Sequence, residues 1–147
     1  MNQGIRVKGM FVAKKFNEQR GVWEVVVRKE NLVVDLGLSW FPKALDGDNP
    51  DLFTYLAVGT DSTATVTTMT GLVTEIARQP IVLTSKNDNE WKASAEFPAG
   101  TGTGVLREFG LFDDSPGGVM FNRVVSNITK GAGDNFSFEF TITFTNN

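Results

Sequence analysis

Phe136-Ser137-Phe138-Glu139-Phe140-Thr141-Ile142-Thr143-Phe144 decides the fold, because apolar and polar residues alternate along it without exception. Successive side chains of a strand point to opposite faces, so this period of two places every Phe and Ile142 on one face. A helix would scatter the same residues around its circumference. Such a face of large apolar side chains needs a covering layer, and we expect a second sheet to provide it. The segment therefore predicts a β-strand in the core of a β protein.

The start of the chain predicts a β-hairpin. Apolar residues of one parity precede and follow a polar turn at residues 17–21. They are Ile5, Val7, Phe11 and Ala13 before the turn, and Trp23, Val25 and Val27 after it. Met10 and Val12 have the other parity beside Gly9, which predicts a bulge there or a strand covered on both faces. We expect the hairpin to span residues 4–30 and to pack on neighbouring subunits.

One short helix and several short strands are predicted between these two elements. Residues 35–45 carry an approximate apolar stripe at helical spacing, with Asp35 or Ser39 as the N-cap and Pro42 limiting the length. Segments bounded by turn residues predict strands at residues 53–58, 76–84, 91–97, 104–112 and 119–125. We therefore expect one mainly β domain over residues 1–147, an antiparallel β-sandwich or barrel-like fold with one short α-helix.

The composition removes most catalytic chemistry. The chain has no histidine and no cysteine, which excludes a Ser–His pair, a cysteine nucleophile and a thiolate or imidazole metal site. Carboxylate pairs remain, as in glycosidases, but no motif selects one of them. The candidate pairs are Asp113 with Asp114 and Glu75 with Glu108. We expect a protein that is not an enzyme.

Metal, nucleic-acid and membrane partners are not indicated either. The aspartates within residues 46–51 lack the central glycine and the closing glutamate of a calcium loop, so we expect no metal and no cofactor. The net charge of −3 comes without a clustered basic patch, which argues against nucleic acid. No apolar run approaches the ~20 residues of a membrane span. The polar N-terminus lacks the apolar core of a signal peptide, so we expect a soluble protein that is made in a cytoplasm and is not exported by a cleaved signal.

Two segments and two arginines are candidates for contacts with other subunits. Met10, Phe11 and Val12 give the hairpin more apolar surface than a one-sided sheet can bury. Residues 59–71 are rich in Thr and lack apolar periodicity, which predicts a loop free to meet a neighbour. Its candidate contact residues are Thr63, Thr65, Thr67 and Thr68. Arg78 and Arg107 either join Glu75 and Glu108 in a partly buried ion-pair network or contact another subunit, where Arg is enriched.

A different class of function depends on Trp91. If this side chain is exposed, the neighbouring Asn87, Asp88 and Asn89 would complete a site on which a sugar ring can stack. A tryptophan in an apolar strand is more often part of the core. A carbohydrate-binding module that recognises a glycan is therefore the alternative function.

The middle of the chain carries short motifs in a distinctive order. Leu56-Ala57-Val58-Gly59-Thr60 is followed, after the Thr-rich loop, by Arg107-Glu108-Phe109-Gly110-Leu111-Phe112. Residues 31–38 precede them, and residues 119–125 and the final strand follow them. This order, over residues 31–144, resembles that of small virion structural proteins of tailed bacteriophages, the tail-fibre and collar-fibre attachment domains.

The resemblance implies a virion protein that is made in the cytoplasm of a host bacterium, assembles with copies of itself and anchors other virion proteins. A trimer or a ring is the oligomer that it implies. The chain lacks a fibrous shaft and a distal tip, which suggests an adaptor, collar or decoration role. Recognition of a host glycan by this chain itself is the less favoured expectation.

Overall fold

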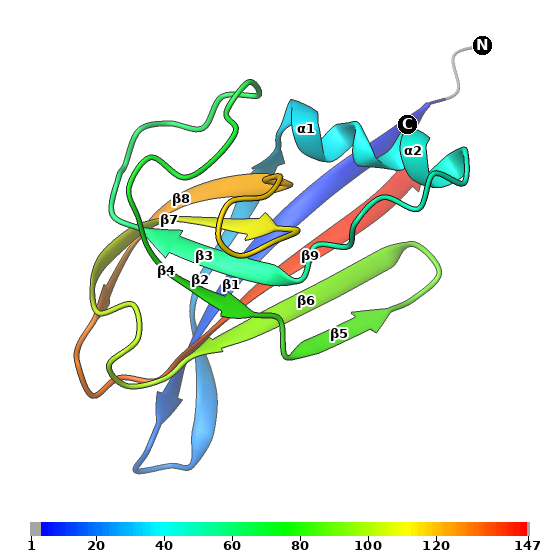
Figure 1. Ribbon diagram of the computed structural model, residues 1–147. Coiled ribbons are helices and arrows are strands. Elements are labelled where there is room, and N and C mark those ends of the chain that lie inside the picture. Colours follow the sequence, from blue (N-terminus) through cyan, green and yellow to red (C-terminus); the bar gives the residue numbers. More distant parts are fainter. Residues whose placement is uncertain (1–3, 147) are drawn as a thin grey trace.

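The structure is a computed structural model that describes residues 4–146, and its main feature is one curled antiparallel sheet (Figure 1). Across the described residues the strand order is β4-β3-β7-β8-β2-β1-β9-β6-β5. The strands are β1 (Ile5–Asn17), β2 (Val22–Val33), β3 (Tyr55–Gly59), β4 (Glu75–Pro80), β5 (Leu83–Lys86), β6 (Glu90–Phe97), β7 (Gly104–Phe112), β8 (Asn122–Lys130) and β9 (Phe136–Asn146). The mainly β, antiparallel prediction is confirmed, and the sheet has the shape of a half-barrel.

The curl follows from the connection between the two edge strands. β4 and β5 lie at opposite ends of the sheet, yet only Ile81 and Val82 separate them in the chain. The Ile81 N–H donates to the Thr54 carbonyl at 2.8 Å, and the Val82 N–H donates to the Ser94 carbonyl at 2.9 Å. This corner ties both ends of the sheet together, so a single sheet covers its own inner face. It also divides the strand predicted at residues 76–84 into two.

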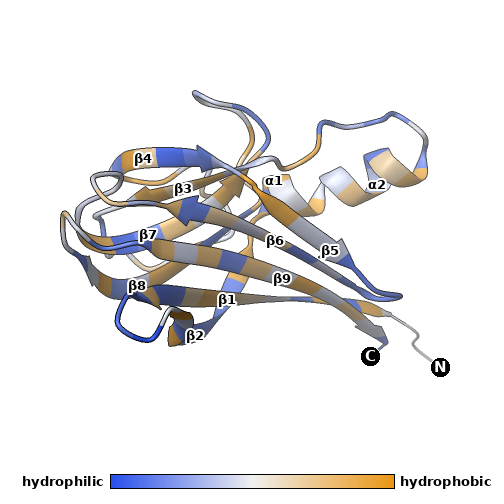
Figure 2. Cartoon of the chain, turned by 90° about the horizontal axis from the view of Figure 1, so that it is seen from below, coloured by the Kyte–Doolittle hydropathy of each residue, from blue (hydrophilic) through white to orange (hydrophobic). Residues whose placement is uncertain are grey.

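The core fills the inside of the curl. Phe136, Phe138, Phe140 and Ile142 of β9 are all buried, which confirms the face predicted from their alternation. Figure 2 shows the alternation of hydropathy along β9. The Phe11 ring of β1 lies 4.6 Å from the Phe109 ring of β7, and the Phe138 ring lies 5.0 Å from that same ring. The covering layer is therefore the opposite wall of the same sheet, whereas the sequence predicted a second sheet.

A smaller cluster lies on the outside of the sheet. Ala57 of β3 and Phe112 of β7 are buried there together with Val34 and Met120. Met69 and Leu72, from the segment between β3 and β4, pack against them. This segment therefore contributes to a core, in contrast to the free loop predicted at residues 59–71.

The helix predicted at residues 35–45 is present as two consecutive pieces, α1 (Asp35–Leu38) and α2 (Trp40–Leu45). Neither Val34 nor Ser39, which precede the two pieces, makes a capping hydrogen bond with its side chain. Tertiary contact holds α1 instead, because a Cβ added at Gly37 would lie 2.1 Å from the Phe121 carbonyl oxygen. The helical segment covers one end of the half-barrel (Figure 1).

Two boundaries differ from the sequence prediction. The strand predicted at residues 119–125 is β8, which runs from Asn122 to Lys130 because its second half pairs with β7 without any apolar alternation. Beside Gly9 the sequence predicted a bulge or a strand covered on both faces. The bulge lies instead between Ala13 and Lys14, and the second alternative holds, because the consecutive residues Phe11, Val12 and Ala13 are all buried. Gly9 allows the Asn31 side chain to lie close to the β1 backbone, since a Cβ at position 9 would lie 2.2 Å from that side chain.

Candidate functional site

The sheet is open on one side, between β2 and β8. Within the described residues, β2 pairs with β8 only through Leu32 with Arg123 and Val33 with Asn122. The rest of β2, residues 22–31, has β1 on one side, and no strand from the described part of the chain pairs with it on the other. Lys29 reaches across the opening and donates a hydrogen bond to the Val125 carbonyl. Most of this long strand therefore keeps one edge free, and such an edge is a template for pairing with another chain.

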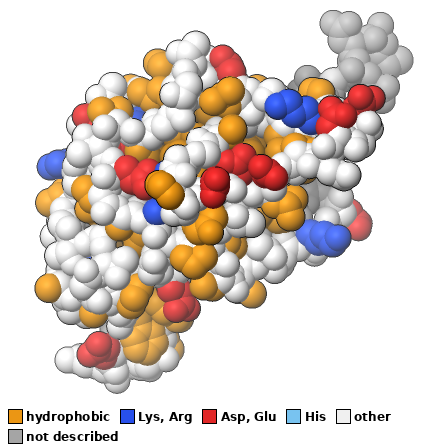
Figure 3. Space-filling view, viewed as in Figure 1, with side chains coloured by type: hydrophobic (Ala, Val, Ile, Leu, Met, Phe, Trp, Pro, Cys, Tyr) orange, Lys and Arg blue, Asp and Glu red, His pale blue; other side chains and the backbone are white. Residues whose placement is uncertain are grey.

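The same hairpin exposes apolar side chains on both faces. Consecutive residues of a strand point to opposite sides, yet Val25 is 50% exposed and Val26 is 49% exposed. Val22 and Trp23 near the turn are exposed as well, and Phe16 packs against Trp23 with ring centroids 5.2 Å apart. The tip of the β1–β2 hairpin projects beyond the body of the molecule, and its apolar side chains reach the surface (Figures 1 and 3).

Of the hairpin residues predicted at an interface, two are used inside the chain. Phe11 is fully buried and belongs to the central aromatic cluster, and Val12 is 3% exposed. Their side chains are therefore not available to a neighbour in this fold. Met10 is partly exposed. The large apolar side chains that the hairpin does expose are Ile5 at the start of β1 and Val22, Trp23, Val25 and Val26 on β2.

A buried ion pair anchors the segment between β3 and β4. Glu108 and Arg123 are both fully buried, and Arg123 Nη2 lies 3.2 Å from Glu108 Oε1. The Glu108 carboxylate also accepts backbone hydrogen bonds from Val73 and Thr74, both at 2.7 Å, and from Asp61 at 3.2 Å. Gly59 allows this approach, because a Cβ there would lie 2.5 Å from Glu108 Oε2. The segment is held from within by one carboxylate.

Arg123 fixes the beginning of the same segment. Its Nη1 donates to the Thr63 carbonyl at 2.6 Å and to the Thr65 hydroxyl at 2.9 Å. The Thr67 carbonyl accepts the Asp35 N–H at 2.8 Å. Thr65 is partly buried, whereas Thr63, Thr67 and Thr68 remain exposed. The predicted contact threonines thus lie on a rigid surface, with part of their backbone already paired.

Asp61 adds an acid-sensitive contact to this anchor. Hydrogen bonds from Thr63, and more weakly the charge of Arg123, lower the pKa of Asp61 against the opposing effect of desolvation. A carboxyl group whose pKa is lowered by folding stabilises the fold above its unfolded pKa, and that contribution is lost as the pH falls through the folded pKa. The attachment of this segment therefore weakens in acid.

Arg78 and Arg107 lie in different environments. The guanidinium of Arg78 pairs with Glu75 at 2.6 Å and lies 3.9 Å from the centroid of the Phe112 ring. It also donates to the carbonyl groups of Asp114 and Gly117. Arg107 makes one long hydrogen bond, 3.4 Å, to the Thr60 carbonyl and stays partly exposed. The predicted network of Glu75, Arg78, Arg107 and Glu108 is therefore not formed as one group. Glu75 pairs with Arg78, Arg107 belongs to neither ion pair, and the partner of Glu108 is Arg123, which the alternation of the sequence could not identify.

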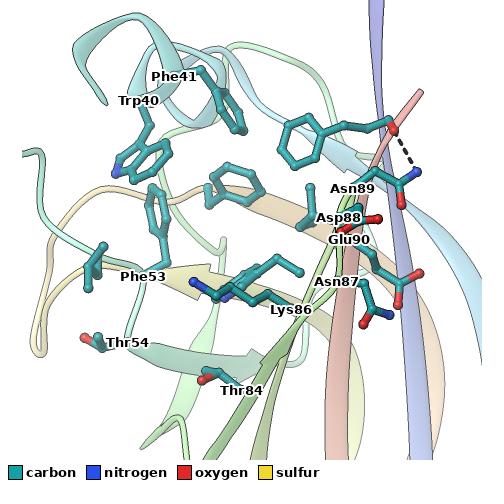
Figure 4. A pocket seen from close by; sticks show the side chains of 15 residues that line it. Trp40, Phe41, Phe53, Thr54, Thr84, Lys86, Asn87, Asp88, Asn89 and Glu90 are labelled. Carbon is teal, nitrogen blue, oxygen red and sulfur yellow. Dashed lines mark hydrogen bonds between the residues drawn. The ribbon is translucent and has the colours of Figure 1, made fainter. Parts of the chain in front are cut away.

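An aromatic cavity opens at the end of the half-barrel covered by α2. Its volume is about 440 Å³, within the range of roughly 300–1,000 Å³ for small-molecule sites. Trp40 and Phe41 of α2 form one side, Phe53 lies below them, and the β5–β6 turn with Asn87 and Asp88 forms the other side (Figure 4). The remaining apolar lining is Leu52, Trp91, Phe121, Ile142 and Phe144.

Hydrogen bonds and ring contacts hold the aromatic wall in place. The Trp40 indole N–H donates to the Asp51 carbonyl at 2.9 Å. Phe41 meets Phe144 edge-on, with centroids 5.4 Å apart, and Asn89 donates to the Phe144 carbonyl at 3.0 Å (Figure 4). The cavity brings Trp91 together with Asn87, Asp88 and Asn89, while Trp91, which the sequence-based sugar site required to be exposed, is partly buried.

Within residues 4–146, no group of three or more acidic residues is placed to hold a metal ion. In that same part of the chain, no helix has the length and apolarity to cross a membrane. The carboxylates that the sequence offered as catalytic pairs make structural contacts in the fold. Glu75 pairs with Arg78, Glu108 anchors the β3–β4 segment, and Asp113 accepts the Val119 N–H at 2.6 Å.

The two motifs on which the resemblance rests lie side by side. β3 and β7 pair along their whole shared length, with Gly59 opposite Glu108 and Ala57 opposite Gly110. Gly110 permits close packing, since a Cβ there would lie 2.7 Å from the Asn122 carbonyl oxygen. Compared with protein-family models, with curated proteins and with solved structures, the chain gives no match.

Proposed function

We propose that this chain is a non-enzymatic structural protein of a bacteriophage virion, which assembles with copies of itself and anchors other virion proteins. The observation that carries the proposal is the free edge of β2 at residues 22–31, flanked by exposed Val25 and Val26. Strand addition at such an edge supplies main-chain hydrogen bonds, and the flanking side chains add apolar burial and specificity.

The distribution of charge supports contact between unlike surfaces of two copies. Residues 1–30 contain seven basic and three acidic residues, whereas residues 31–147 contain seven basic and fourteen acidic residues. The hairpin of one copy is thus attracted to the body of the next. A contact between two different surfaces is heterologous and closes into a ring when the rotation allows it, which agrees with the trimer or ring expected from the resemblance.

Val26→Glu, which opposes the attraction between the basic hairpin and the acidic body, should shift the protein to the monomer mass of 16.1 kDa in size-exclusion chromatography with light scattering. The substitution places a charge beside the β2 edge and should weaken association more than about tenfold, or 1.4 kcal/mol. Because Val26 is half exposed, the free energy of unfolding should change by less than about 0.5 kcal/mol. High salt should weaken association of the unmodified protein as well.

Leu45→Glu is the matched control for this experiment. Leu45 is 90% exposed at the end of α2, so the variant adds the same charge on an exposed apolar residue away from the hairpin. Its oligomeric state should equal that of the unmodified chain. Identical masses for the Val26 and Leu45 variants would contradict assembly through β2.

Purified phage particles test the virion assignment directly. An antibody raised against the recombinant chain should label one fixed position on each particle in electron microscopy, and the chain should appear among the particle proteins in mass spectrometry. A chain that is abundant in the infected-cell lysate but missing from purified particles would refute the virion role, even if the isolated protein is oligomeric.

A further inference from the structure

One indole of the aromatic cavity, that of Trp91, packs against the core but lies outside the network of paired rings found among the described residues. Trp40, Phe41, Phe53, Phe121 and Phe144 are joined by ring contacts with centroids 4.7–6.3 Å apart. Among the described residues, Trp91 takes part in none of the aromatic pairs, although it lines the same cavity and is only partly buried. Its ring therefore offers apolar surface to an occupant of the cavity.

Most polar side chains of the cavity lie on one rim. Apart from Thr54, which precedes β3, they come from β5, the β5–β6 turn and the start of β6: Thr84, Lys86, Asn87, Asp88, Asn89 and Glu90. In the part of the chain that the structure describes, the side chains of Asn87 and Asp88 accept or donate no hydrogen bond, and the Asn89 amide donates only to the Phe144 carbonyl. Amide and carboxylate groups at the edge of this aromatic surface can therefore form hydrogen bonds with an occupant of the cavity.

The charges of this rim select a neutral occupant. Lys86 is positive, while Asp88 and Glu90 are negative, and Glu90 is partly offset by Lys92 at 3.6 Å. An anion would meet two carboxylates and a cation would meet a lysine, so neither is favoured by the local field. A wholly apolar occupant would desolvate Asn87 and Asp88 without replacing their hydrogen bonds to water.

We propose that this cavity binds a neutral pyranose ring, the apolar face of the sugar stacked on Trp91 and its hydroxyl groups directed to the Asn87–Glu90 rim. A pyranose combines an apolar C–H face with a polar edge, which matches an aromatic wall beside amide and carboxylate groups. The site lies at the end of the half-barrel covered by α2, away from the tip of the β1–β2 hairpin, so binding does not depend on assembly (Figure 1).

Titration with neutral sugars tests the proposal. The probes are the methyl glycosides of glucose, galactose, mannose and N-acetylglucosamine and their β-linked disaccharides, followed by calorimetry and by tryptophan fluorescence. At least one stereochemistry should bind, and Trp91→Ala should weaken that binding more than about tenfold. Trp23→Ala is the matched control, because Trp23 lies near the hairpin turn and its loss should leave the affinity unchanged.

Substitutions at the exposed rim keep the test decisive if the Trp91 variant does not fold. Asn87→Ala and Asp88→Ala should each weaken sugar binding several-fold, while the melting temperature stays unchanged because both residues are exposed. No binding across the panel would overturn the proposal. Binding of indole or cyclohexanol in place of every sugar, or sugar binding that is insensitive to all three substitutions, would overturn it as well.

Discussion

Phe140→Ala should destabilise the protein by about 3–5 kcal/mol, the range for truncating a buried aromatic side chain. Phe140 is fully buried in the middle of β9, and its ring centroid lies 5.2 Å from that of Phe11. β9 itself is central, because it pairs with β1 on one side and β6 on the other. The loss should be measured as the free energy of unfolding in a denaturant titration, with unchanged dependence on denaturant.

Glu139→Gln is the control on the neighbouring residue of the same strand. Glu139 points to the opposite face, where its side chain is partly exposed and lies 3.8 Å from Lys14. A partly exposed ion pair of this length contributes less than about 1 kcal/mol, so the control should remain close to the unmodified protein. Equal losses for the two variants would show that the inner and outer faces of β9 are wrongly assigned.

Glu108→Ala should cost a similar amount, about 3–5 kcal/mol, because it leaves the fully buried Arg123 without its partner. It also removes the acceptor of the Val73 and Thr74 N–H groups. Beyond the global loss, these two amides should exchange their hydrogens faster in the native protein, since the β3–β4 segment opens locally. Denaturant unfolding and native-state hydrogen exchange together check both effects.

Two arginine substitutions distinguish the loss of the buried ion pair from the loss of a positive charge elsewhere in the protein. Arg123→Met should destabilise strongly, because it leaves the Glu108 carboxylate buried and unpaired. Arg107→Met, which removes a partly exposed arginine with one 3.4 Å hydrogen bond, should cost less than about 1 kcal/mol. The double variant of Glu108 and Arg123 should lose less than the sum of the single losses. Additive losses, or a large effect at Arg107, would contradict the anchor.

Local periodicity accounts for much of this fold. The alternation at residues 136–144 predicts the buried face of β9, and the turn residues place the hairpin, β6 and β7 close to their observed bounds. These features are local: a period of two depends only on the direction of successive side chains. The same reasoning brings Trp91 and Asn87–Asn89 to one site, because they are neighbours along a strand and its turn.

Features that depend on distant contacts were decided by the tertiary structure. The partner of Glu108 is Arg123, fifteen residues away in sequence, and neither side chain departs visibly from the pattern of its strand. The segment between β3 and β4 has the sequence of a free loop because most of its anchoring contacts use backbone N–H and carbonyl groups, which every sequence offers equally. The burial of Phe11 and Val12 likewise depends on distant parts of the chain that cover the two faces of β1.

The sequence by itself determined that the chain is a mainly β protein without histidine or cysteine chemistry, because composition and period are properties of the chain alone. Only the tertiary structure decided that one sheet curls onto itself, since this follows from β4 and β5 meeting across a two-residue corner. It also decided where the sheet stays open, at β2, and where its end forms the aromatic cavity. Both result from strand order, which is a matter of long-range pairing and leaves no local signal in the sequence.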